Sequence, residues 1–242
     1  MIRVDSTSGR FGAPRLALLA GGLGWLTVVS LAGCFDVHAV DPGPLVLDDF
    51  EGAELLPADP AFGVWSCRRF NPDTSEGVTC DRDTPGYQGA HSLRLSAQVT
   101  DLQNSRMDHG GAALVTRVVG PLVDMTRFQK VTFGAKVESG EPPLPAGAQL
   151  LVELGCKNVQ RDDMTWSDAS RVTQAAPYNT SWQTVSLAMR NFISPSYDPV
   201  HFAGGPAECL VQVDSVRFAL NAELDDGGSA ELSLWIDSIS FQ

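Results

Sequence analysis

Apolar residues recur at every second position along most of this chain. From Leu45 onward they do so in short runs, such as 93–99 and 131–137, which are bounded by Gly, Pro, Asp or Asn. This period is typical of β-strands with one buried face. After residue 33 no window keeps an apolar stripe at helical spacing for three turns. The pattern predicts an all-β domain, an antiparallel β-sandwich or barrel of about nine or ten strands.

The last strand changes register near its end. The apolar residues of 232–236 have even numbers, whereas Ile239 and Phe241 have odd numbers. A β-bulge at Asp237 and Ser238 accounts for the change, because one extra residue reverses the faces that follow it. A bulge also re-aims a side chain, so we expect the Asp237 carboxylate to turn towards the first strand.

The first 33 residues follow a different pattern. Three arginines precede an apolar stretch over 16–31, and the small residues Ala32 and Gly33 come directly before Cys34. A basic start, an apolar stretch and small residues are the parts of an export signal. A transmembrane helix is the alternative, since about 18 apolar residues can span a bilayer. Three glycines in the stretch lower its helix propensity and disfavour that alternative.

The sequence Leu31-Ala32-Gly33-Cys34 resembles the lipobox of bacterial lipoproteins. The resemblance implies that residues 1–33 are a signal peptide and that Cys34 is lipidated and begins the mature chain. Two or more acyl chains hold a protein stably at a membrane. Residues 34–44 then form a short tether, and residues 45–242 form the domain. An aspartate directly after the cysteine can favour the inner membrane in such lipoproteins. Phe35 stands there instead, so we expect an envelope protein of the outer membrane.

The net charge of the chain limits the classes of partner that it can bind. The formal net charge is −12, and it becomes −14 once the three arginines and one aspartate of residues 1–33 are removed. Nucleic acid repels such a domain, and a nucleic-acid-binding protein needs a basic patch first. Acidic side chains can, however, supply oxygen ligands to calcium.

The cysteine count agrees with export. Without Cys34, four cysteines remain, an even number in a compartment that permits disulfides. Of three possible connectivities we favour Cys67 with Cys80, since the loop between them is polar and rich in turn residues, and Cys156 with Cys209 by elimination. A zinc site is the alternative, but the chain has no Cys-x-x-Cys pair and no His at ligand spacing from a Cys.

Four motifs follow one another in the predicted domain. They are Leu47-Asp48-Asp49-Phe50-Glu51-Gly52, Gly89-Ala90-His91-Ser92-Leu93-Arg94-Leu95, Trp182-Gln183-Thr184-Val185 and Leu234-Trp235-Ile236-Asp237-Ser238-Ile239-Ser240-Phe241. In this order they resemble the galactose-binding-like jelly roll of carbohydrate-binding modules, nearest to family 11 and the related CIA30-type domains. The resemblance covers residues 45–242 and implies a jelly-roll sandwich that binds carbohydrate.

The resemblance also implies a structural calcium ion where the first and last strands meet. Asp49, Glu51 and Asp237, together with loop carbonyls, would supply its oxygen ligands. The alternative is that these three carboxylates are solvated strand ends.

Sugar binding requires aromatic rings that stack on the CH face of a pyranose and polar groups that bond its hydroxyls. Tyr87, Trp166, Tyr178 and Tyr197 lie in polar or turn-rich segments, and Trp235 has the parity opposite to Leu234 and Ile236. Trp65 and Trp182 are expected to pack in the sandwich or along its edge. The polar faces of five strands are expected to line one groove with Trp235; they carry Arg94, Gln98, Lys136, Gln149, Glu153 and Arg217. Ordinary solvated sheet faces are the alternative.

Catalytic motifs are absent from the sequence. It contains no Gly-x-Ser-x-Gly, no His-Glu-x-x-His and no phosphate-binding loop, and its four histidines are scattered. We therefore expect a non-catalytic binding lipoprotein that recognises carbohydrate or an envelope glycan. A surface scaffold or adhesion lipoprotein with a protein partner is the alternative, and a glycan-active hydrolase is the less favoured one.

Overall fold

The computed structural model describes residues 43–52, 54–70, 77–100, 109–140, 148–156, 170–194, 205–223 and 229–242. Cys34, Trp166 and Tyr197 lie outside these ranges, so their predicted roles stay predictions. No helix among the described residues is long and apolar enough to span a membrane.

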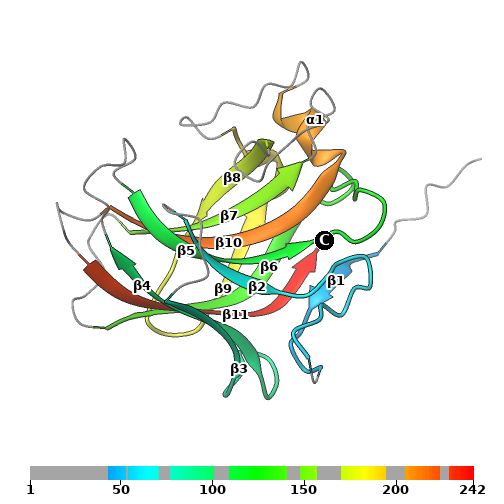
Figure 1. Ribbon diagram of the computed structural model, residues 1–242. Helices are drawn as coiled ribbons and strands as arrows, with labels where there is room; N and C mark the ends of the chain where they lie inside the picture. Colours follow the sequence, from blue (N-terminus) through cyan, green and yellow to red (C-terminus); the bar gives the residue numbers. More distant parts are fainter. Residues whose placement is uncertain are drawn as a thin grey trace, which may run out of the picture. The chain divides into compact units, whose positions relative to one another are not determined.

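Eleven strands, one 3₁₀ turn and one short helix make up the described chain (Figure 1). The strands are β1 (Leu45–Asp48), β2 (Ser66–Phe70), β3 (Val78–Asp83), β4 (Ser92–Thr100), β5 (His109–Arg117), β6 (Lys130–Ser139), β7 (Gln149–Cys156), β8 (Ser170–Ala176), β9 (Gln183–Ala188), β10 (Val213–Glu223) and β11 (Ser229–Phe241). The turn η2 covers Met189–Asn191, and the helix α1 covers Pro206–Leu210.

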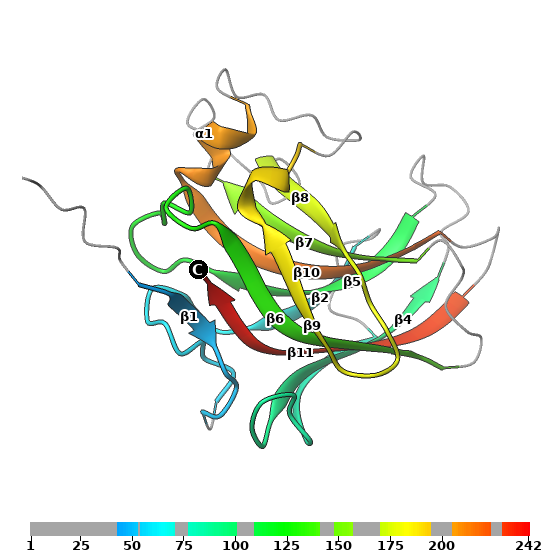
Figure 2. The ribbon, with the colours of Figure 1, turned by 180° about the vertical axis from the view of Figure 1, so that it is seen from behind.

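The strands form two antiparallel sheets. The six-stranded sheet has the order β3-β4-β11-β6-β9, with β1 paired to the end of β11, and the five-stranded sheet has the order β2-β5-β10-β7-β8. Figures 1 and 2 show the two sheets as the layers of a sandwich. The predicted antiparallel β-sandwich is confirmed, with eleven strands in the described chain instead of nine or ten.

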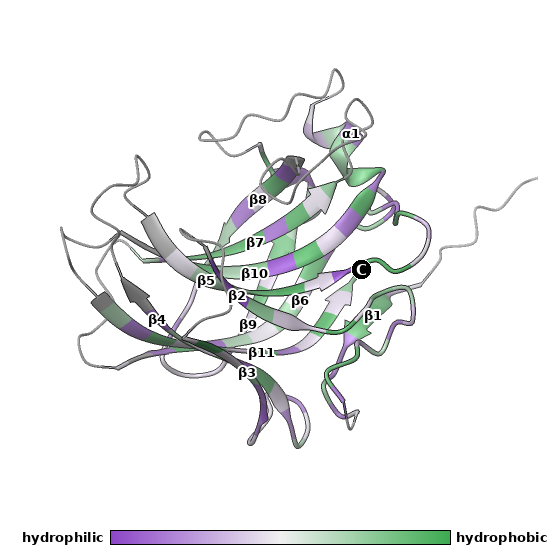
Figure 3. Ribbon diagram, viewed as in Figure 1, coloured by the Kyte–Doolittle hydropathy of each residue, from purple (hydrophilic) through white to green (hydrophobic). Residues whose placement is uncertain are grey.

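The core lies between the sheets and is filled by alternate residues of each strand. Phe218 of β10 and Phe133 of β6 come from opposite sheets and meet edge to face, with ring centroids 4.9 Å apart. Trp65 is 2% exposed and lies 6.2 Å from Phe218, so its predicted packing in the sandwich is confirmed. Figure 3 shows the corresponding alternation of hydrophobic and hydrophilic residues along β7 and β10.

The predicted bulge is present in β11. Its register against β6 shifts between Asp237 and Ser240, and Ser238 has a φ of 51°. The bulge coincides with a change of partner, since β4 pairs with β11 up to Ile236 and β1 pairs with it from Ile239 onward. Because the extra residue reverses the parity, Leu234 and Ile236 before the bulge and Ile239 and Phe241 after it all face the same core.

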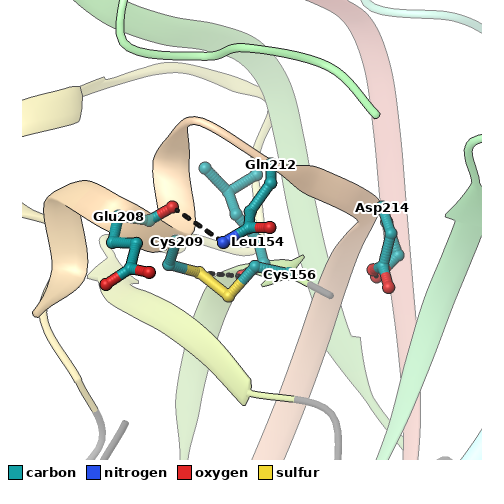
Figure 4. The surroundings of a disulfide bond; sticks show 7 residues. Leu154, Cys156, Glu208, Cys209, Gln212 and Asp214 are labelled. Carbon is teal, nitrogen blue, oxygen red and sulfur yellow. Dashed lines mark hydrogen bonds between the residues drawn. A yellow bond between two sulfur atoms is a disulfide. The ribbon is translucent and has the colours of Figure 1, made fainter. Parts of the chain in front are cut away.

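Both predicted disulfides are confirmed. Cys67 of β2 bonds to Cys80 of β3 and so joins the two sheets, whereas Cys156 bonds to Cys209 and fastens α1 to the end of β7 (Figure 4). The Cys209 Sγ also lies 3.8 Å from the carbonyl oxygen of Leu154. The two bonds therefore act at different places, one across the sandwich and one at its end.

Candidate functional site

Aromatic and cationic side chains gather on the outer face of the six-stranded sheet. Trp235 points away from the core, as its parity predicts. Arg94 of β4 and Lys136 of β6 lie opposite Trp235 in the two neighbouring strands. The Arg94 Cζ is 4.9 Å and the Lys136 Nζ 4.1 Å from the ring centroid. Both are cation–π contacts, which fix the cations and the ring relative to one another.

Trp235 does not offer the exposed ring that the sequence suggested. The residue is 6% exposed, and its indole N–H donates to Asp83 Oδ2 at 3.0 Å. Arg94 lies 3.7 Å from the same carboxylate and donates to Ser233 Oγ at 3.3 Å. A sugar would reach the ring only after displacing a cation. The role that this geometry gives to Trp235 is to order Arg94 and Lys136.

Tyr87 and Trp182 are the more accessible rings of this face. Both are half-buried, and their centroids lie 5.7 Å apart at an interplanar angle of 36°. The Tyr87 hydroxyl forms a hydrogen bond with Thr184 Oγ1. The tyrosine ring lies close over Gly134, where a Cβ would come 2.5 Å from its Cδ1. Glycine at this position therefore lets the ring lie directly on the backbone of β6.

We call Tyr87, Trp182, Trp235, Arg94 and Lys136 the aromatic patch. Lys136 connects its two halves, since its Nζ is 4.1 Å from the Trp235 centroid and 6.0 Å from that of Trp182. Trp182 directly precedes β9, an edge strand of the six-stranded sheet, in agreement with its predicted packing along the edge, but it was not among the predicted ligand residues. Its parity was a usable signal, because it has the parity of Thr184 and the opposite parity to Val185.

Two carboxylates hold the segment that carries Tyr87. Asp237 Oδ2 accepts the backbone N–H groups of Tyr87 and Gln88 at 2.5 and 2.9 Å. Glu51 Oε1 accepts those of Ala90 and His91 at 2.8 and 2.9 Å. The bulge thus turns Asp237 towards the loop before β4. Glu51, which follows β1, accepts hydrogen bonds from the other end of the same loop.

The environments of these two carboxylates differ. Asp237 is fully buried, and burial raises the pKa of its carboxyl against the lowering effect of its hydrogen bonds. Glu51 is exposed, and the hydrogen bond from the His91 backbone lowers the pKa of its carboxyl. Glycine is needed at position 89 for two reasons: its φ is +136°, which other residues rarely adopt, and a Cβ there would clash with Glu51 Oε1.

The predicted calcium ligands do not form a metal site. Glu51 and Asp237 bind backbone N–H groups, and Asp49 is exposed and accepts the N–H of Glu51 at 3.2 Å. In the described part of the chain, no group of three or more His, Cys, Asp or Glu side chains is placed to hold a metal ion. Oxygens that face N–H donors are poorly arranged for a cation. These residues therefore do not fit the calcium ion that the resemblance implied.

The pKa of a further buried carboxylate, Asp48, can be tested by titration, and a second aspartate–tryptophan pair serves as the internal control. Its Oδ2 accepts the Trp65 indole N–H at 2.7 Å, and burial raises its pKa to about 6. The matching pair is Asp83 and Trp235, where the indole hydrogen bond lowers the pKa of Asp83. We expect the Trp65 indole resonance to shift with a midpoint near pH 6 in an NMR titration. The Trp235 resonance should shift only below the usual range of an aspartate.

The sign of the stability effect follows from the same shift. Since the pKa of Asp48 is higher in the folded than in the unfolded chain, its ionised form disfavours folding above pH 6. Its contribution to stability therefore improves as the pH falls from about 7 towards about 4. A Trp65 resonance that stays constant between pH 7 and 5 would contradict the assignment.

Glu153 and Arg217 lie on the other sheet and not in one groove with Trp235. They belong to β7 and β10 of the five-stranded sheet and point to its outer face. Glu153 is 4% exposed; its Oε2 is 3.1 Å from Arg217 Nε and its Oε1 is 3.6 Å from Arg171 Nε. The expected single groove is thus corrected to two separate faces. Strand alternation separates core from solvent but does not say which sheet a strand joins.

Tyr178 makes a structural hydrogen bond within the domain. It follows β8, is 36% exposed, and its hydroxyl donates to the carbonyl oxygen of Ala148 at 3.1 Å. The bond ties the segment after β8 to the residue before β7. Tyr178 is therefore placed at the end of the five-stranded sheet, outside the aromatic patch.

Comparison with solved structures finds several of similar fold. The family 11 carbohydrate-binding module of the cellulosomal cellulase Lic26A-Cel5E of Clostridium thermocellum is similar with a TM-score of 0.52 and 15% identity, over 82% of this chain and 94% of that one. The family 11 module from Clostridium thermocellum in complex with a β-1,3-1,4-mixed-linked tetrasaccharide gives 0.51 and 15%, with the same coverage. The solution structure of CtCBM11 gives 0.50 and 16%, over 85% and 96%.

At these identities the likeness establishes the jelly-roll fold. No protein-family model matches the sequence, and no curated protein does. The expected resemblance to family 11 is thereby confirmed at the level of structure.

Proposed function

We propose that this protein is a non-catalytic carbohydrate-binding lipoprotein, held at the outer membrane by lipid on Cys34, and that its aromatic patch contacts the glycan. The observation that carries the proposal is the pair Tyr87 and Trp182. Two aromatic rings lie side by side on the solvent side of a sheet, where the core does not need them.

The chemistry around this pair suits a sugar. A pyranose presents CH groups to an aromatic face and hydroxyls at its rim. Thr184 is exposed beside Tyr87, and Lys136 and Arg94 supply donors next to the rings. The family 11 module of similar fold was solved with a β-1,3-1,4-mixed-linked tetrasaccharide, which makes polysaccharides with these linkages the first ligands to test.

Binding should depend on Trp182. We expect the purified domain to bind one or more polysaccharides on an array that includes β-1,3-1,4-glucan. Trp182→Ala should weaken this binding about tenfold, the equivalent of about 1.4 kcal/mol, because a stacking surface is removed. Trp182→Phe should retain most of the affinity, since it keeps a flat ring. Isothermal titration with the best array ligand measures both.

A variant on the other sheet separates the two faces. Asn221→Ala changes a half-buried side chain that points outward from β10. It should leave binding unchanged if the aromatic patch is the site. Loss of binding in Asn221→Ala with full binding in Trp182→Ala would place the ligand on the five-stranded sheet. Absence of any polysaccharide ligand would contradict the proposed function itself.

A further inference from the structure

Exposed apolar side chains gather at one end of the sandwich. Of the eight large hydrophobic residues that are exposed in the described chain, five belong to neighbouring loops. They are Leu56 (46% exposed), Val64 (59%), Val119 (68%), Leu122 (39%) and Val211 (53%), which we call the apolar end. Single exposed apolar residues are ordinary, whereas a group of them marks a surface that contacts something.

Hydrogen bonds between the loops show that these residues form one surface. The N–H of Gly63 donates to the Arg117 carbonyl at 2.7 Å, and the N–H of Val119 donates to the Ala61 carbonyl at 2.9 Å. Val123 and Val213 exchange two bonds of 3.0 Å. These contacts place the segments that carry Val64, Val119, Leu122 and Val211 next to one another.

Leu56 belongs to the same surface. The N–H of Trp65 donates to the Leu55 carbonyl at 2.8 Å, so residues 55–56 lie beside residues 64–65. The apolar end thus extends over two loops, the one between β1 and β2 and the one between β5 and β6, and the residue after α1.

The chain enters the domain at this same end. Leu45, the first residue of β1, pairs with Phe241, and the N–H of Gln129 donates to the carbonyl of Gln242 at 2.6 Å. Gln129 is the last residue of the loop between β5 and β6, which carries Val119. Figure 2 shows β1 and the C-terminus together beside this loop.

The length of the tether keeps the apolar end close to the membrane. Residues 34–42 separate the lipidated cysteine from the first described residue, and an extended chain spans about 3.3 Å per residue. The entry point therefore lies within about 30 Å of the lipid surface. Five exposed apolar side chains are within reach of the bilayer that holds Cys34.

The charge at this end is mixed and does not itself favour contact with lipid. The domain as a whole is strongly acidic, but the exposed residues Arg117, Arg127, Lys130 and Arg190 lie in or beside these loops. Arg190 is included because the N–H of Met189 donates to the Gln129 carbonyl at 2.8 Å. Acidic residues of the same loops more than offset this charge, since Asp49, Glu51, Glu54 and Asp124 are exposed and Asp59, Glu208 and Asp214 are half-buried. Contact with lipid would therefore depend on the apolar side chains and not on charge.

We propose that the apolar end rests on the bilayer, with its valine and leucine side chains at the boundary between headgroups and acyl chains. The proposal builds on the Cys34 anchor of the proposed function. The strands run from this end towards the other, so the sheet faces stand up from the membrane. The aromatic patch then opens sideways, accessible to a polysaccharide that runs along the envelope.

A fluorescent label at Val119 tests the contact. The chain has five cysteines, of which four form disulfides and the fifth is Cys34, so a cysteine introduced at Val119 can be labelled alone. The lipidated full-length product is labelled with nitrobenzoxadiazole and reconstituted into vesicles of phosphatidylethanolamine and phosphatidylglycerol. Nitroxide lipids should quench the Val119→Cys label by at least half.

Thr180→Cys is the matched control. Thr180 is exposed and follows Asn179, whose carbonyl accepts the N–H of Val137 near the far end of β6. Its label should show no quenching. If neither label is quenched, in protein that floats with the vesicles, the membrane contact is overturned and the anchor is left intact.

Flotation itself tests the anchor. Wild-type protein should float with the vesicles, and residues 35–242 alone, which lack both the apolar stretch 16–31 and Cys34, should stay in the soluble fraction. Wild-type protein that fails to float would overturn both the anchor and the membrane contact. A blue-shifted Val119 label without quenching, together with a dimer mass, would assign the apolar end to a second copy of this chain and also overturn the membrane contact.

Discussion

Asp237→Ala is expected to cost about 3 kcal/mol of folding free energy and to abolish glycan binding, because Asp237 holds the segment that carries Tyr87. Its Oδ2 is the acceptor for two backbone N–H groups, those of Tyr87 and Gln88. Alanine removes this acceptor in a place without exposed surface. Each buried donor left without a partner costs about 1–3 kcal/mol. Urea unfolding measures the loss, and titration with the array ligand measures binding.

Asp237→Asn is the matched control and should behave very differently. Both backbone bonds go to one oxygen, so an asparagine carbonyl can accept both, while its amide nitrogen can donate to Ser238 Oγ. Burial raises the pKa of Asp237, so the ionised carboxylate is itself disfavoured, and a neutral side chain removes this cost. We expect a change below about 1 kcal/mol and retained binding. Equal losses in the two variants would contradict the role of the single accepting oxygen.

Phe218→Ala is expected to cost about 4 kcal/mol and to lower the melting temperature by about 12 °C. Phe218 is fully buried in β10, where its ring meets Phe133 of the opposite sheet at 4.9 Å and Trp65 at 6.2 Å. Truncation opens a cavity between the sheets that neighbouring strands cannot fill, since both sheets are fixed by their hydrogen bonds. Calorimetry measures the change directly.

Ile193→Ala provides the comparison for Phe218→Ala. Ile193 is 62% exposed, so its truncation should change stability by less than about 0.5 kcal/mol. Glycan affinity measured well below the melting temperature should be unaffected in both variants, since neither residue belongs to the aromatic patch. A Phe218→Ala protein as stable as Ile193→Ala would contradict the inter-sheet core.

Several features of the fold were predictable because they depend on neighbours in the sequence. The alternation of apolar residues indicated the strands and their buried faces, and the parity change in the last strand located the bulge at Asp237. The turn-rich loop between Cys67 and Cys80 indicated one disulfide, and elimination then gave the other. Parity also placed Trp235 on the outer face of its sheet.

The candidate site was less predictable, because it depends on which strands become neighbours. Arg94 and Lys136 reach Trp235 only because β4 and β6 flank β11. Glu153 and Arg217 have the same polar alternation, yet their strands belong to the other sheet. Likewise, an acidic residue can bind a cation or a backbone N–H, and only the position of residues 84–91 shows that Glu51 and Asp237 bind N–H groups.

The sequence by itself determined the period of the strands, the parity of each side chain and the acidic, disulfide-bonded character of the domain, since these are local or compositional properties. The tertiary structure decided the strand order, the pairing of Tyr87 with Trp182 and the gathering of the apolar end. These contacts join residues that lie tens to more than a hundred positions apart. Their formation depends on sheet pairing and loop packing, which no local pattern contains.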